Sequence, residues 1–143
     1  MNTRREILAL LSGAVLTSAA ELAKPDTWIT IATPGRNKNQ RQYTPVALRA
    51  MREGCVGAKV MKGNIWPDEG SLALLLGMVR SARALADGTV QVQINWFSGK
   101  RPKTVGYITP TGNGQIEADS VISYRLSFLC FSPDSAFEGA TKL

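Results

Sequence analysis

Strict alternation of apolar and polar side chains over Thr89 to Phe97 most limits what this chain folds into. A repeat of two residues is typical of a β-strand with one buried face. One face of this strand takes the apolar Val90, Val92, Ile94 and Trp96, and the other takes the amides Gln91, Gln93 and Asn95. The C-terminal part of the chain is therefore expected to form a sheet that is covered on one side.

Two further strands are predicted to follow this one. Lys103 to Thr109 comes after a turn at Ser98 to Pro102, and Val121 to Phe131 comes after a turn at Pro110 to Gly114. Consecutive strands joined by short turns most simply form an antiparallel meander, which we predict over residues 89–131. The last strand is expected to carry one apolar side, made of Ile122, Tyr124, Leu126, Phe128 and Cys130.

Two helices are predicted to cover this sheet. The central one spans Leu72 to Ala86, where apolar residues recur at helical spacing, and the N-terminal one spans residues 1–23. A short helix from Pro45 to Glu53 and strands at Thr27 to Ala32 and Val56 to Met61 complete the pattern. We therefore expect one domain over residues 1–143, of α+β class, with an antiparallel β-meander of about 4–5 strands packed against an N-terminal helix and a central helix.

The N-terminal segment has a second interpretation. Arg4 and Arg5 precede an apolar run, and small residues at 18–20 would suit a signal-peptide cleavage site. The stretch from Thr3 to Leu8 also resembles a twin-arginine export motif. Helical periodicity continues to Leu22, past that cleavage site, and favours a retained amphipathic helix. Neither reading provides the ~20 apolar residues that a transmembrane helix needs.

Positive charge is concentrated in one part of the chain. The 143 residues carry a net charge of +6, and residues 36–62 alone contain seven positive residues and only Glu53 as a negative one. The flanking segments are balanced. A localised basic region is the usual electrostatic footprint for contact with nucleic acid, an acidic protein surface or anionic lipid.

The candidate site is this basic surface. Its parts are an exposed loop from Arg36 to Tyr43, a helix with outward-facing arginines, the end of the next strand, and a second basic tip after the Thr89 to Phe97 strand. Cations would neutralise phosphates while Tyr43 offers a ring for base stacking. Whether the two basic loops lie together depends on the fold. The predicted anion-binding residues are Arg36, Lys38, Arg41, Tyr43, Arg49, Arg52, Lys59, Lys62, Lys100, Arg101 and Lys103.

Catalytic chemistry finds little support in the sequence. The chain contains no histidine, which removes the usual general base and the commonest metal ligand. Cys55 and Cys130 lie among apolar neighbours, so we expect two buried thiols rather than a disulfide. We assign no catalytic residue, no metal site and no cofactor.

These observations favour a non-enzymatic binding or assembly protein. The leading hypothesis is a virus or phage particle component, such as a capsid, tail or connector protein, whose partners are copies of itself, other particle subunits or nucleic acid; it would be cytoplasmic or in the virion. One alternative is a small nucleic-acid-binding regulator. Another is an exported bacterial protein, periplasmic or secreted, that has lost residues 1–20 as a leader.

Overall fold

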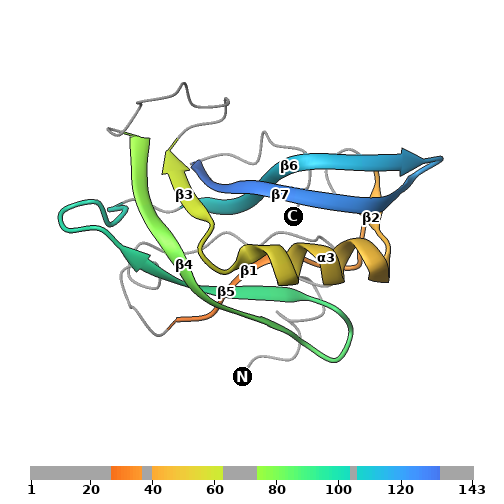
Figure 1. Ribbon diagram of the computed structural model, residues 1–143, viewed down its shortest axis with the longest axis horizontal. Helices are drawn as coiled ribbons and strands as arrows, with labels where there is room; N and C mark the ends of the chain where they lie inside the picture. Colours follow the sequence, from red (N-terminus) through yellow and green to blue (C-terminus); the bar gives the residue numbers. More distant parts are fainter. Residues whose placement is uncertain (1–26, 37–39, 63–73, 104–105, 133–143) are drawn as a thin grey trace.

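A single curled, mixed sheet dominates the computed structural model, which describes residues 27–36, 40–62, 74–103 and 106–132 (Figure 1). One helix, α3 (Pro45–Cys55), lies against it within these ranges. The strands are β1 (Ile29–Ala32), β2 (Gln42–Tyr43), β3 (Lys59–Lys62), β4 (Leu75–Ala84), β5 (Val90–Trp96), β6 (Tyr107–Glu117) and β7 (Ser120–Ser132).

The strand order is β1-β5-β4-β3-β7-β2, and β6 pairs with β7. Neighbouring strands are antiparallel from β1 through β3, and β6 is antiparallel to β7. By contrast, β2 and β3 both run parallel to β7. The short β2 lies beside the start of β7 and β3 beside its end, so β2, α3 and β3 form a crossover along one edge of that strand.

The helix begins where the sequence predicts. Thr44 is the N-cap, and its Oγ1 accepts a hydrogen bond from the backbone N–H of Ala47 at 3.2 Å. Pro45 follows in the first turn, where the missing N–H costs nothing. Leu48 and Met51 are buried and Arg49 is exposed, as expected from helical periodicity. α3 therefore packs its apolar stripe against the sheet.

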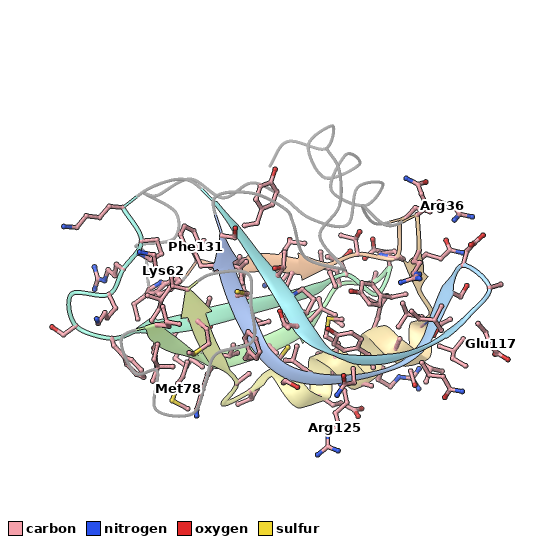
Figure 2. The ribbon with its side chains drawn as sticks, turned by 90° about the horizontal axis from the view of Figure 1, so that it is seen from above. Arg36, Lys62, Met78, Glu117, Arg125 and Phe131 are labelled. Carbon is pink, nitrogen blue, oxygen red and sulfur yellow. The ribbon has the colours of Figure 1, made fainter. Side chains whose placement is uncertain are left out.

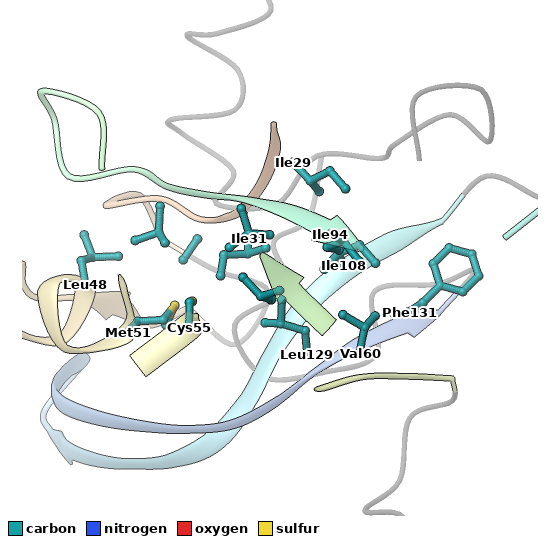
Figure 3. Packing of buried hydrophobic residues seen from close by; sticks show 14 of the residues in the cluster. Ile29, Ile31, Leu48, Met51, Cys55, Val60, Ile94, Ile108, Leu129 and Phe131 are labelled. Carbon is teal, nitrogen blue, oxygen red and sulfur yellow. The ribbon is translucent and has the colours of Figure 1, made fainter. Parts of the chain in front are cut away.

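The main core fills the space between α3 and the inner face of the curled sheet (Figure 3). β5 contributes Val90, Val92 and Ile94, all buried, which confirms the alternation seen in the sequence. A second, smaller cluster of Met61, Phe128 and Cys130 is also buried. Both faces of the sheet are thus apolar around the end of β7.

The predicted apolar side of the last strand is wrong, because β7 changes face along its length. Tyr124 and Leu126 pack against the main core, whereas Phe128 and Cys130 belong to the second cluster. Register shifts in the pairing with β6 leave one extra β7 residue on each side of the segment 123–126. Each β-bulge turns the following side chains to the opposite face.

The predicted central helix over Leu72 to Ala86 is also wrong, since Leu75–Ala84 forms β4. Its pairing with β5 shifts register between Val79 and Ser81. With a second register shift at Leu76, in the pairing with β3, this irregularity puts Leu76, Val79 and Ala82 against the main core, and their spacing of three residues imitates a helical repeat. The good helix formers in the segment are overridden because strands β3 and β5 pair with it on both sides.

Other expectations about the fold need correction. The α+β meander is replaced by a mostly β fold in which β5 pairs with β1 and β4, and β6 pairs with β7. Pro110 to Gly114 is not a turn but lies inside β6, and the hairpin turns at Ala118 and Asp119 instead. The predicted N-terminal helix lies outside the described residues. Within the described ranges, no helix combines the length and apolarity needed to cross a bilayer.

Gly77 tests the assignment of β4 as a strand. A Cβ at this position would collide with the backbone oxygen of Asn95 on β5, so Gly77→Ala must push the two strands apart. We expect a loss of about 1–3 kcal/mol in unfolding free energy, measured by urea denaturation. Gly54→Ala is the matched control. It adds the same methyl group to α3, where the nearest atom is 4.0 Å away, and is expected to stabilise by about 0.5 kcal/mol. If Gly77→Ala stabilised the protein as Gly54→Ala is expected to, the result would contradict the strand and favour a helix at 72–86.

Candidate anion-binding site

A pocket of about 380 Å³ opens at one end of the curled sheet. Its lining comes from the end of β3, from β4, from the end of β7 and from the loop between β5 and β6. We call this site the basic pocket. Its described lining residues are Lys62, Leu76, Gly99, Lys100, Arg101, Pro102, Lys103 and Phe131.

Strand register brings the two sides of the basic pocket together. In the parallel pairing of β3 with β7, Lys62 lies directly opposite Phe131. Leu76, on β4, accepts a hydrogen bond through its carbonyl from the backbone N–H of Phe97 at 2.9 Å. The end of β5, and with it the loop at residues 97–103, which we call the basic loop, is therefore tied to β4, which contributes Leu76 to the pocket lining.

A tight turn fixes the start of the basic loop. The N–H of Lys100 donates to the carbonyl of Phe97 at 2.9 Å, and Gly99 has a φ of 73°. A positive φ at the third turn position is the geometry of a type II turn, which glycine adopts without strain. Pro102 then restricts the backbone between Arg101 and Lys103. The loop thus presents three cations from a constrained backbone.

The charge of the basic pocket is of one sign. Four of its described lining residues are cations and none is a carboxylate. None of the ion pairs between described residues involves Lys62, Lys100, Arg101 or Lys103. The cations are exposed, whereas Leu76 and Phe131 are only 7% and 6% exposed. The site is therefore a rim of solvated positive charge over an apolar floor.

Arg36 lies elsewhere and has local partners. Its Nη1 donates to the carbonyl of Gln40 at 2.7 Å and lies 3.9 Å from the carboxylate of Asp119 in the β6–β7 turn. Both ionic side chains are largely exposed, so this pair adds little stability. Arg41 is half-buried and has partners of its own. Lys38 lies outside the described residues.

Tyr43 does not offer an exposed ring for base stacking. It is 4% exposed, and its ring packs edge-on against Tyr124 with centroids 5.7 Å apart. Such a T-shaped contact is a favourable aromatic pair in a core. Tyr43 is therefore a core residue that holds β2 against β7.

The remaining predicted cations lie on and after the helix. Arg49 is exposed on α3. The Nη2 atom of Arg52 lies 3.9 Å from the carboxylate Oε1 of its neighbour Glu53. Lys59 is exposed at the start of β3. Because β3 leads from α3 toward the basic pocket, Lys59 and Lys62 sit at opposite ends of one short strand.

The structure divides the basic segment of the sequence. Figure 2 places Lys62 and Phe131 toward one end of the molecule, and Arg36 and Glu117 toward the other. The loops at 36–43 and 100–103 consequently do not form one groove. Lys62 joins the Lys100, Arg101 and Lys103 loop, and Arg36 joins the turn of the β6–β7 hairpin.

Sequence reasoning missed the floor of the basic pocket. Leu76 was assigned to a helix, and Phe131 was treated only as the end of a strand. The single local signal was that both apolar residues stand near a strand end, which is too common to identify a pocket. Their meeting depends on the parallel pairing of β3 with β7, a contact between distant segments.

The cysteines are free and buried, as expected. Burial raises the pKa of the Cys55 thiol to about 12, against a smaller opposing effect of Arg52. Burial likewise raises the pKa of the Cys130 thiol to about 12. They lie in different apolar clusters. A thiol held in the neutral form is a poor nucleophile, so neither residue fits covalent catalysis.

The thiols give a test of native packing. At pH 8 we expect the folded protein to react slowly with an aromatic disulfide reagent, and the denatured protein to react at once with two equivalents. Because unfolding lets both thiols ionise at their ordinary pKa near 8.5, their contribution to stability falls as pH rises above that value. Rapid labelling of either cysteine in the native protein at pH 8 would contradict this burial.

The chain has no match among known protein families, curated proteins or solved structures. Among the described residues, no group of three or more acidic or cysteine side chains is placed to hold a metal ion.

Proposed function

We propose that this protein is a non-catalytic binding protein that contacts the phosphate backbone of a nucleic acid at the basic pocket. One observation carries the proposal: Lys62 and the cations at 100, 101 and 103 converge on a single pocket from segments far apart in the sequence. Phosphate contacts of this kind position a polymer without reading its sequence.

The exposure of these cations favours a polyanion over a small anion. An ion pair at an exposed site contributes only about 0–1 kcal/mol, so one carboxylate or phosphate gains little here. A nucleic acid engages several cations at once and releases its condensed counterions, which makes weak individual contacts additive.

The side-chain donors of the basic pocket suit the same partner. Arg101 and the three lysines can donate to several phosphate oxygens at once, whereas Leu76 and Phe131 are buried and only close the pocket beneath these cations. A single lipid headgroup or a short acidic peptide presents fewer charges to the four cations than a chain of phosphates does. We therefore place nucleic acid ahead of these two partners.

A component of a virus or phage particle is the setting we propose for this binding. Such a protein contacts packaged nucleic acid and copies of itself, which requires a charged surface and an assembly surface on a small chain. The 143-residue chain has a net charge of +6, and four cations gather at one end of the sheet. Sequence-independent phosphate contact is the mode that such a component needs.

The salt dependence of binding tests the proposal. With all four cations on phosphates, log K against log salt is expected to have a slope of about −3.6 on duplex DNA and about −2.8 on a single strand. The double variant Lys62→Ala with Arg101→Ala should lower affinity and reduce the duplex slope by about 1.8. Fluorescence anisotropy of a labelled oligonucleotide measures both quantities.

A charge-matched control is available on the same molecule. Arg49→Ala with Arg125→Ala also removes two exposed cations, and Arg125 lies well away from Lys62 in Figure 2. This control should bind nearly as the unmodified protein does. Equal losses in both double variants would mean that net charge, not the basic pocket, drives binding, and a salt-independent affinity would rule out phosphate contact.

A further inference from the structure

One long strand of the sheet has an edge that no other described strand occupies. β6 pairs with β7 over residues 107–117, and no described strand pairs with its other side. β7 differs, since β6 occupies one of its edges while β2 and β3 share the other. Within the part of the sheet that the structure describes, β6 is therefore an eleven-residue edge strand.

The distal part of β6 is the accessible part. β1 comes close to β6 without a strand pairing between them. In Figure 2 β6 then runs on to the hairpin tip marked by Glu117, away from β1. Residues 113–117 are all exposed. Their outward N–H and C=O groups form no backbone hydrogen bond to a described residue outside the hairpin.

This edge lacks the usual protection against pairing. Natural edge strands are blocked by lysine, proline, bulges or short length. The distal segment 112–117 contains no lysine, arginine or proline, and its only charge is Glu117 at the end. The two register shifts in the hairpin insert extra residues into β7, so β6 itself stays regular.

We propose that this edge is a subunit interface at which β6 pairs antiparallel with β6 of a second copy. A twofold axis at Gln115 places Asn113 opposite Glu117 of the second copy, so no like charges face each other. It also places Gly114 opposite Ile116 of the second copy. Ile116 is 38% exposed, and a glycine opposite it leaves room for the side chain.

The self-complementary pattern favours a second copy over a foreign strand. In this register Glu117 of each copy faces the uncharged Asn113 of the other. The amides of the two Gln115 side chains meet on the axis, where each can donate a hydrogen bond to the other and accept one from it. A single strand pairing buries less area than the roughly 1,200–2,000 Å² of a stable interface. The dimer is therefore expected to be weak, with a dissociation constant of roughly 1–100 µM.

Charge reversal at the axis tests the interface on the full chain. Sedimentation velocity over a concentration series should show reversible dimerisation of the unmodified protein. Gln115→Lys and Gln115→Glu each place like charges face to face, and each should weaken dimerisation by up to about fivefold. An equimolar mixture of the two variants should restore it as a heterodimer, because opposite charges then meet. Gln115 is exposed, so neither variant should disturb the monomer fold.

The matched control places the same charge off the edge. Ser127→Lys lies on β7 at an exposed position and should leave dimerisation unchanged. A protein that is monomeric at every concentration would overturn the proposal. So would a dimer that is insensitive to Gln115→Lys, or a variant mixture that fails to associate, since either would place the contact elsewhere. Nucleic-acid binding is measured separately at the basic pocket, so the two proposals can fail independently.

Discussion

Hydrogen bonding along both edges of β7 fixes the positions of most other elements. β6 follows one edge over almost the whole strand, while β2 and β3 take the two ends of the other edge. Between β2 and β3 the chain has to leave the sheet, and α3 fills that crossover with its apolar side on β7. Two bulges then let one strand serve two apolar clusters, since Leu126 faces the main core and Phe128 the second cluster.

The same pairing produces the basic pocket. Parallel register brings Lys62 level with Phe131, and the antiparallel β4–β5 pair carries the basic loop to the same end of the sheet. A one-residue slip of β3 on β7 would turn Lys62 to the other face and separate it from the loop. The clustering of cations therefore rests on buried contacts such as Val60 opposite Leu129, both fully inaccessible to solvent.

Local chemistry determined which elements were predictable from the sequence. β5 alternates strictly, and α3 has Thr44 and Pro45 at its start, so both were predicted close to their actual bounds. β4 was not, because its bulge gives inward residues a helix-like spacing. β6 was cut short because Pro110 and Gly112 usually mark turns, whereas here Pro110 is buried and lies within the strand opposite Leu129.

The candidate site was predictable as a set of charges but not as a place. Lys62, Lys100, Arg101 and Lys103 were identified as cations, yet their convergence needs a parallel contact between β3 and β7, for which the sequence carries no local signal. Tyr43 shows the opposite error. Next to a polar loop it was expected to be exposed, but its pairing position in β2 turns the ring toward Tyr124.

The basic pocket and the exposed end of the β6 edge lie at opposite ends of the molecule, and this separation matters for assembly. Lys62 and Glu117 mark the two ends in Figure 2. The hairpin end carries the carboxylates of Glu117 and Asp119 beside Arg36, so pairing there does not bring the four pocket cations together. In the proposed dimer, joined at that end, the two basic pockets would lie on the outer sides. If both pockets contact one polyanion, as proposed, the second contact is strengthened by effective concentration rather than by new interactions.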